Sequence, residues 1–422
     1  MQAGQLVIDV RPLRSSRDYR WLLGGKFASL AGNAVALTAA NWQVFELTRS
    51  SLAVGMLSLT DSGGMLVGLL AGGMLADRHD RRALLAAVQL PQAMLSVGLL
   101  VNSLLAHPAL WPLYLVTLLL GLMSGIGAPA MTATTPALVA PSQLAAAAAL
   151  NSMSGQLGSL GGPALAGYLI SGPGLAACYG ADAAGFAVFG IAMLFVGPLR
   201  PAERGQRPGL RSLREGLAYV RHHGVVGGML LIDTNAMIFG MPTALFPALA
   251  REHFHGGPST FGLLTAAPAL GAIIGAATSG WTGQLRRPGV VVIGSGLAWG
   301  ASIACFGLTR SLAFGLVLLA LAGMSDLISE VLRNALLQRY TPDRLRGRVS
   351  SLYLAQVNTA PAVGNAEAGL VAQLTTPAFS VLSGGLACVA GALLLGSLIP
   401  ALRRASLAGP AAAGDPGEAT AA

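Results

Sequence analysis

Long apolar stretches separated by short polar segments fill most of this 422-residue chain. A protein core does not need this much apolar sequence, but a bilayer does, since each membrane-spanning helix takes about 20 mostly apolar residues. The pattern therefore predicts an all-α membrane protein with twelve transmembrane helices. They are expected near 20–47, 52–76, 83–106, 110–137, 143–170, 174–198, 225–249, 259–284, 289–309, 312–338, 348–372 and 378–401.

Composition agrees with this pattern. The chain is 54% apolar and only 10% charged, with a mean hydropathy of +0.64, whereas soluble domains carry about 25% charged residues. The first 18 residues contain Asp9, Asp18 and three arginines, with no short apolar core followed by a small-residue cleavage site. We therefore expect no cleaved signal peptide.

Basic residues predict the orientation of the helices. With the N-terminus in the cytoplasm, 21 of the 26 Lys and Arg residues fall in cytoplasmic segments and three in external loops. This asymmetry follows the positive-inside rule and places both termini in the cytoplasm. The net charge of +9 then reflects topology and contact with anionic inner-leaflet lipid. We expect the lipid bilayer as a partner and no nucleic acid.

The chain divides into two halves around a long polar segment. TPALVAPSQLAAAAALNS (135–152) and LLQRYTPDRLRGRVSSLY (336–353) share an apolar stretch followed by Pro, two polar residues and Leu, about 201 residues apart. Repeated six-helix halves are typical of secondary transporters. GLRSLREGLAYVRHH (209–223) has the spacing of an amphipathic helix at the cytoplasmic surface, although a solvated linker helix fits as well. The expected parts are an N-terminal segment 1–19, a first bundle 20–198, a linker 199–223, a second bundle 224–402 and a disordered tail 403–422.

Residues that could carry catalysis or bind a cofactor are scarce. The three cysteines fall in apolar spans and the six histidines in loops or at span ends, without metal-ligand spacing. No G-x-S-x-G nucleophile motif and no phosphate-binding G-x-x-x-x-G-K-[ST] loop is present. We expect no enzyme activity, no metal and no cofactor. A membrane-embedded sensor is a further alternative, but it would need an appended soluble domain.

LADRHDRR (75–82) concentrates five formal charges between two apolar stretches. Positive-inside charge explains its arginines but not Asp77 and Asp80. A tight turn there needs a glycine close to a neighbouring helix, which Gly73 can supply, and Asp77 can meet a helix N-terminus or an arginine. G-x-L-A-D-R-x-x-R-R resembles the signature loop of the major facilitator superfamily. The resemblance implies a conformational gate at the cytoplasmic side, formed by Gly73, Asp77, Arg78, Arg81 and Arg82.

A second stretch, GSLGGPALAG (158–167), resembles the antiporter motif found in the fifth helix of exporters in that superfamily. The matching residues are Gly158, Gly162, Pro163 and Gly167. Ala166 replaces one glycine of the motif, and Ala149 replaces its distant first glycine. Small residues with a proline also allow a close, kinked helix contact, so generic membrane packing is the alternative.

Several further stretches narrow the resemblance to one branch. TATTPALVA (132–140), LFPALA (245–250), GLLTAAPALGAIIGAATSG (262–280) and LLQRYTPDRLRGRVSSLYLAQ (336–356) resemble the enterobactin-exporter branch of the superfamily over nearly the whole chain. The resemblance implies a multi-pass protein of the bacterial inner membrane, most simply a monomer. It further implies export of a catecholate siderophore, a small molecule, from cytoplasm to periplasm, driven by protons.

Ionisable residues inside spans are expensive and tend to be functional. Asp326, Glu330 and Arg333 occupy positions i, i+4 and i+7 of one predicted helix, so they share a face and Glu330 can pair with Arg333. Arg333 is close enough to the cytoplasmic end that snorkelling is the alternative. Asp326 and Asp233 are the first candidates for a proton site. The full set of candidate proton or substrate residues is Asp326, Glu330, Arg333, Asp233, Asp61 and Glu367.

These same residues leave the substrate open between two alternatives. They depart from the enterobactin-exporter pattern, and acids lining a cavity suit cations better than catecholates. A multidrug or macrolide exporter on the same fold is therefore the competing hypothesis. Structural pairing of each acid is a third interpretation, which needs no substrate at all.

Overall fold

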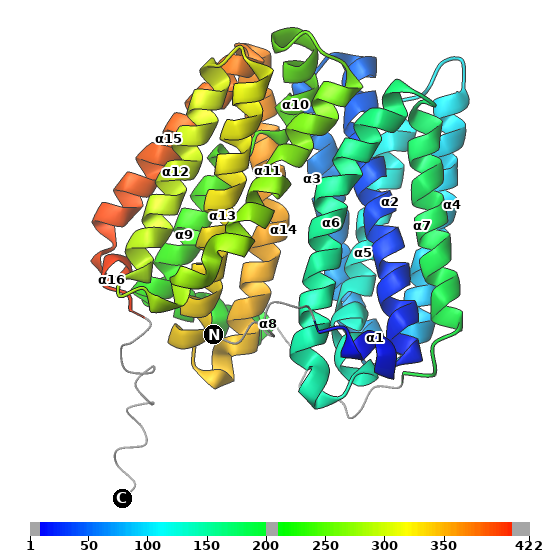
Figure 1. The fold of residues 1–422 in the computed structure, drawn as a ribbon, viewed down its shortest axis with the longest axis horizontal. Helices are drawn as coiled ribbons and strands as arrows, with labels where there is room; N and C mark the ends of the chain where they lie inside the picture. Colours follow the sequence, from blue (N-terminus) through cyan, green and yellow to red (C-terminus); the bar gives the residue numbers. More distant parts are fainter. Residues whose placement is uncertain (1–8, 200–209, 407–422) are drawn as a thin grey trace, which may run out of the picture. The chain divides into compact units, whose positions relative to one another are not determined.

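The computed structural model describes residues 9–199 and 210–406, without the side chains of 210–213, 283 and 284. Within these ranges the chain is helical with no strand, as Figure 1 shows. The first half contains α1 (Arg11–Ser15), α2 (Arg17–Thr48), α3 (Ser51–Ala76), α4 (Arg81–Leu104), α5 (Trp111–Leu138), a 3-10 turn (Pro141–Gln143), α6 (Leu144–Ser171) and α7 (Leu175–Leu194).

The second half begins with α8 (Leu210–His222) and α9 (Gly224–Phe239), followed by a 3-10 turn (Thr243–Leu245), α10 (Phe246–Ala248) and a π-helical turn (Leu249–His253). It continues through α11 (Pro258–Thr278), a 3-10 segment (Ser279–Gln284), α12 (Pro288–Leu308), α13 (Leu312–Tyr340), α14 (Asp343–Leu374), α15 (Pro377–Leu398) and α16 (Pro400–Arg403).

Nine helical stretches among the described residues are long and apolar enough to cross a membrane. They are α3, α4, α5, α7, α12, α13, α15 and the stretches Gly224–His253 and Pro258–Thr282. This confirms an all-helical, multi-spanning protein. The remaining three predicted spans coincide with α2, α6 and α14, which are 32, 28 and 32 residues long but more polar.

The described chain forms two compact units, each with its own packed interior. The N-terminal unit contains the helices up to α7 together with 244–266, and the C-terminal unit contains 210–243 and 267–406. In the first unit α2 packs on α6 and α7, and α3 on α5; in the second, α9 packs on α14 and α15, and α12 on α13 and α15. The segment 244–266 thus groups with the first unit, although it lies within the second half of the sequence.

Glycines allow α3 and α5 to approach at backbone distance. A Cβ added to Gly68 would lie 2.1 Å from the Leu122 carbonyl oxygen, and one added to Gly72 would lie 2.5 Å from that of Ile126. Small residues permit this contact between apolar helices, where little else holds them together. The sequence prediction that Gly73 makes the close approach is wrong. A Cβ there would meet nothing within 4 Å, because Gly73 is one residue, about 100°, round the helix from Gly72.

The span predicted near 225–249 is a broken helix. α9 ends at Phe239, and Gly240 follows against the ring of Trp299, where a Cβ would lie 2.6 Å from Nε1. The Trp299 indole N–H donates to the Gly240 carbonyl oxygen. Pro242 and Pro247 lack the N–H groups that a continuous helix would need, so the chain turns through short helical pieces instead.

Within the predicted linker, α8 is helical and packs on α14. Glu215 forms an ion pair with Arg348, and the Tyr219 hydroxyl donates to the Tyr340 carbonyl oxygen. Val220 packs into the interior of the C-terminal unit, whereas Leu217 is 54% exposed. The predicted apolar face of this helix also includes Leu210 and Leu213, whose side chains lie outside the described part of the chain. Residues 1–8, 200–209 and 407–422 of the predicted N-terminal segment, linker and tail lie outside it too.

Candidate functional site

A charged cluster lies inside the C-terminal unit, where α13 meets α9. Arg333 Nη2 of α13 is 2.9 Å from Asp233 Oδ1 of α9 and 3.6 Å from Asp326 Oδ1 on its own helix. The side chains of Arg333 and Asp233 are only 6% and 1% exposed, whereas that of Asp326 is 33% exposed. One buried guanidinium is therefore shared between a sealed carboxylate and an accessible one.

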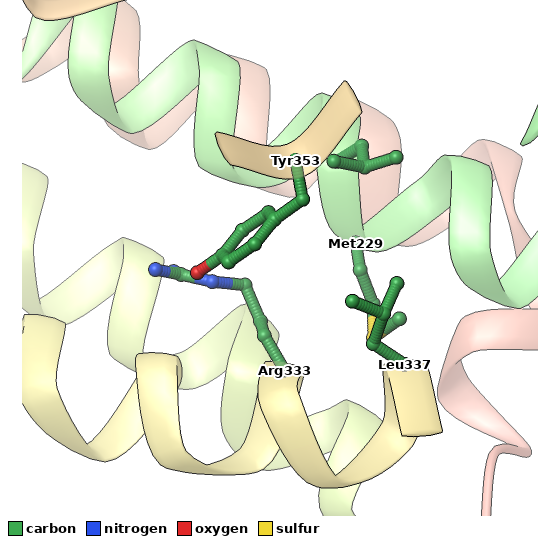
Figure 2. A pocket seen from close by; sticks show the side chains of 5 residues that line it. Met229, Arg333, Leu337 and Tyr353 are labelled. Atoms are coloured by element: carbon green, nitrogen blue, oxygen red, sulfur yellow. The ribbon is translucent and has the colours of Figure 1, made fainter. Parts of the chain in front are cut away.

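Polar side chains from α13 and α14 complete this cluster. Arg333 Nη1 donates to Ser329 Oγ over 2.8 Å, and Gln356 Nε2 donates to Asp233 Oδ2 over 2.9 Å. Figure 2 shows the Tyr353 hydroxyl directed at the Arg333 guanidinium. Buried charges need both an opposite charge and hydrogen bonds. Here α9, α13 and α14 each contribute to meeting that need.

A small pocket opens beside the guanidinium. Its lining residues are Met229, Leu230, Arg333, Leu337 and Tyr353 (Figure 2). Its volume of about 10 Å³ is the space of roughly one water molecule. The pocket suits a water or a proton path, and it is far too small for an aromatic substrate.

The other predicted charged residues form no ion pair with this cluster among the described residues. Glu330 is exposed on α13, one turn from Asp326 and Arg333, and its charge still acts on Asp233 and Asp326. Glu367 is half-buried on α14, eleven residues beyond Gln356. Asp61 is half-buried on α3 of the other unit. Within the C-terminal unit the structure therefore brings Asp233, Asp326 and Arg333 into one cluster, with Glu330 close by on α13. Arg333 pairs with the two aspartates rather than with Glu330.

Lys26 and Asp182 each make a polar contact between long helices of the N-terminal unit. Lys26 Nζ of α2 donates to Asn151 Oδ1 of α6 over 2.8 Å. Asp182 of α7, which is completely buried, accepts a hydrogen bond of 2.6 Å from Ser96 Oγ of α4. Neither contact involves an opposite charge, which distinguishes this unit from the C-terminal cluster.

The loop at 75–82 joins α3 to α4 and touches the segment that follows α7. Asp80 is the N-cap of α4, because its Oδ1 accepts the Arg82 N–H over 2.9 Å, and it also accepts the Leu199 N–H over 3.1 Å. The Arg82 guanidinium donates to the Val196 carbonyl oxygen over 2.8 Å, and that of Arg81 to the Ala133 carbonyl oxygen over 3.3 Å. Asp80, Arg81 and Arg82 thus fasten the loop to its surroundings.

Asp77 and Arg78 behave differently, since both are exposed. Asp77 is the C-cap of α3 through its backbone N–H, which donates to the Gly73 carbonyl oxygen over 3.3 Å. The contact with a helix N-terminus that the sequence suggested for Asp77 is made by Asp80. Asp is a preferred N-cap residue, and the position of Asp80 three residues before the apolar run that begins at Ala83 could have identified it in advance.

The antiporter-like residues of α6 make close contacts inside the N-terminal unit. A Cβ on Gly162 would lie 2.4 Å from the Ala34 Cβ, and one on Gly167 would lie 2.7 Å from the Pro258 carbonyl oxygen. A Cβ added to Gly262 would lie 2.6 Å from the Pro163 carbonyl oxygen. Gly158 has ordinary spacing, with its nearest neighbour at 3.7 Å. Gly162, Pro163 and Gly167 therefore hold α6 against α2 and the start of α11.

Comparison with known proteins identifies the family. Residues 9–410 match the transmembrane secretion effector family of the major facilitator superfamily. The chain belongs to this family. It is also 32% identical to the enterobactin exporter EntS of Citrobacter koseri and to that of Escherichia coli O139:H28, over 94% of this chain and 95% of each relative.

Solved structures share the fold at low sequence identity. A POT family transporter in complex with 5-aminolevulinic acid matches with a TM-score of 0.72 and 14% identity, covering 92% of this chain and 97% of the transporter. A bacterial homologue of the iron transporter ferroportin, in an inward-facing state, matches with a TM-score of 0.69 and 16% identity, covering 92% and 99%. These likenesses show the major facilitator fold.

Family membership confirms the resemblance read from the sequence. The chain is an exporter-like, multi-pass protein of the inner membrane that handles a small molecule, and it is a transporter rather than an enzyme. Among the described residues, no group of three or more His, Cys, Asp or Glu side chains could hold a metal ion.

Proposed function

We propose that this protein exports an enterobactin-like catecholate siderophore from cytoplasm to periplasm by alternating access, driven by the proton gradient. The observation that carries the proposal is the nearly full-length similarity to enterobactin exporters. In this proposal α2, α6 and α14 cross the membrane along with the nine apolar stretches. The protein then has twelve spans, two six-helix bundles and both termini in the cytoplasm, and it works as a monomer.

Asp326 is the proposed proton carrier. Its carboxylate is one-third exposed, so a proton can reach it, while Asp233 is sealed by Arg333 and Gln356. The Arg333–Asp326 contact of 3.6 Å is longer than the Arg333–Asp233 contact of 2.9 Å. Protonation of Asp326 would leave Arg333 fully to Asp233, because a neutral carboxyl no longer attracts the guanidinium. Proton binding would thus change the charge balance along α13, the kind of two-state change that coupling requires.

The loop at 75–82 and the contacts of α6 are proposed to control the conformational change. Asp77 and Arg78 are free to form new ion pairs, whereas Asp80, Arg81 and Arg82 anchor the loop. Gly73 has no neighbouring atom of the described residues within 4 Å of the position of a Cβ, so this end of α3 has room to move. Gly162, Pro163 and Gly167 supply a close contact without bulky side chains. Glu330, Asp61 and Glu367 remain secondary proton or substrate candidates.

The test is uptake of iron-free enterobactin into inside-out vesicles, with and without a protonophore. We expect uptake that depends on the gradient and is lost in Asp326→Asn. Asp343→Asn is the matched control, because Asp343 is an exposed acid at the start of α14 whose partner is Arg346. It should transport like the wild type.

A cationic dye assayed beside enterobactin decides between substrates. Uptake of the dye without enterobactin would move the protein to the multidrug branch. Transport that survives complete collapse of the proton gradient would refute proton coupling. Equal loss in Asp326→Asn and Asp343→Asn would show that Asp326 has no special part in it.

A further inference from the structure

Lys26 is the only lysine in the chain, and it lies within α2 rather than at its end. It follows Arg20 by six residues, which places it about 9 Å deeper along the helix axis. Ionisable side chains within spans are costly and mark functional sites more often than packing sites. The Lys26 ammonium is therefore expected to have a polar or charged partner at this position.

The partner that the structure provides is neutral and firmly held. Asn151 accepts the Lys26 hydrogen bond through Oδ1, while its Nδ2 donates to the Ala147 carbonyl oxygen over 2.9 Å and to the Tyr19 hydroxyl over 3.4 Å. The Tyr19 hydroxyl itself donates to the Ala147 carbonyl oxygen over 3.1 Å, and Tyr19 is fully buried. This network fixes the amide so that its oxygen faces the ammonium.

The charge of Lys26 is left uncompensated by this arrangement. No ion pair of the described residues includes Lys26. An ammonium has three donors, and Asn151 occupies one. Because the side chain is only half-buried, the other two can reach a bound molecule.

We infer that Lys26 binds an anionic oxygen of the transported molecule, either a deprotonated catechol or a carboxylate, at the contact between α2 and α6. The inference rests on the proposed export function and adds to it the charge of the group that the N-terminal unit recognises. The local charge supports an anion over a cation. At the contact between α2 and α6 the Lys26 ammonium has no carboxylate among the described residues, whereas in the other unit Arg333 is paired with Asp233 and shared with Asp326.

Asn151→Asp separates this role from a structural one. The new carboxylate would give Lys26 an internal ion pair, which offsets the loss of the Nδ2 hydrogen bonds to the Ala147 carbonyl oxygen and the Tyr19 hydroxyl, so the contact between α2 and α6 should be kept. The same carboxylate would compete with an anionic substrate. A lysine that merely packs or reaches toward the headgroups predicts unchanged or improved transport in Asn151→Asp.

The experiment measures concentration-dependent uptake into inside-out vesicles by wild type, Lys26→Gln, Lys26→Arg and Asn151→Asp, each matched for the amount of monodisperse protein. The compounds are iron-free enterobactin, its O-methylated derivative, which cannot ionise, and 2,3-dihydroxybenzoate. Loss of a hydrogen bond to a charged group weakens binding about 10- to 100-fold. We expect KM for enterobactin to rise by at least about tenfold in Lys26→Gln and Asn151→Asp. It should stay within about threefold of wild type in Lys26→Arg.

For the O-methylated derivative, Lys26→Gln should match the wild type. The wild-type preference for the ionisable compound should also grow with rising pH, and Lys26→Gln should lose that trend. Enterobactin uptake with unchanged KM in Lys26→Gln or Asn151→Asp would overturn the inference and leave the proposed function standing. Uptake of 2,3-dihydroxybenzoate but not enterobactin, lost in both variants, would uphold the inference and remove enterobactin as the substrate.

Discussion

The two units join equivalent helices with opposite chemistry. In the N-terminal unit Lys26 of α2 contacts Asn151 of α6, and in the C-terminal unit Asp233 of α9 contacts Gln356 of α14. Lys26 and Asp233 are 207 residues apart, and Asn151 and Gln356 are 205 apart, close to the repeat of the two halves. Each pair thus links the first and fifth long helices of its half through a charge and an amide.

The units differ in what balances that charge. Arg333 of α13 compensates Asp233, whereas the corresponding region of α5 near 125–132 contains no ionisable residue. The Asp233 carboxylate therefore has an opposite charge within the protein, whereas the Lys26 ammonium has none among the described residues, as the proposed anion site requires. Duplicated halves need not share a task. One can hold the coupling charges while the other recognises the substrate.

Arg333→Met should produce the largest effect. Asp233 is 1% exposed, and removal of one partner of a buried ion pair costs about 3–5 kcal/mol because the other charge stays buried. We expect a collapse of thermal stability in detergent, measured by size-exclusion chromatography after heating. The double variant Arg333→Met/Asp233→Asn should recover most of it.

Lys26→Met supplies the comparison for that result. Its stability should fall by about 1.5–3 kcal/mol at most, since one hydrogen bond between an ammonium and an amide is lost and no buried charge is left without its partner. Equal losses of thermal stability in Arg333→Met and Lys26→Met would contradict the view that Asp233 depends on an opposite charge within the protein and Lys26 does not.

Gln356→Leu should have the next largest effect. The Gln356 amide donates to Asp233 Oδ2 over 2.9 Å, and a buried acceptor left without its donor costs about 1–3 kcal/mol. Thermal unfolding should show this loss in the wild-type background. It should shrink when Asp233 is replaced by Asn, since the coupling between the two residues is then removed.

The loop at 75–82 offers a similar contrast with smaller effects, because Asp80 is held by hydrogen bonds and the Asp77 side chain is exposed. Asp80→Ala removes the N-cap of α4 and should cost about 0.5–2 kcal/mol. Asp77→Ala should leave thermal stability unchanged, because the Asp77 side chain is exposed. A stability loss in Asp77→Ala equal to that in Asp80→Ala would contradict this assignment of the cap.

The helices could be predicted from the sequence, but most contacts between them could not. Apolar length alone located most of the long helices to within a few residues, because the bilayer sets one dominant constraint on each span, but it missed the end of α9 at Phe239. Helical spacing placed Asp326 and Arg333 on one face. It could not show that Asp233, a hundred residues away in sequence, completes the pair. Such pairing depends on how α9, α13 and α14 pack.

The same limit explains the errors and omissions at single residues. Gly73 and Gly72 are equivalent as sequence, and only the direction of α5 decides which glycine is needed. The part played by Asn151 was equally hidden, because an isolated asparagine within an apolar span has many possible partners. Its fixed amide is recognisable only once α2 lies beside α6.

The smallest expected effect concerns His223, which lies outside the membrane-spanning segments, just before α9. Its Nδ1 accepts the Val226 N–H over 3.3 Å as an N-cap, and its ring stacks on Tyr219 at 5.2 Å. Burial lowers the pKa of His223 below its ordinary value of about 6.5. Between the lowered and the ordinary pKa, the unfolded chain binds more protons than the folded one, so stability falls as pH falls through that window. Protonation also converts the Nδ1 acceptor into a donor and removes the cap.

His223→Asn keeps an N-cap acceptor without a titrating group, so its thermal stability between pH 7.5 and about pH 5 should decline less than that of the wild type. An identical decline in both proteins would assign the acid sensitivity of this helix end to another group.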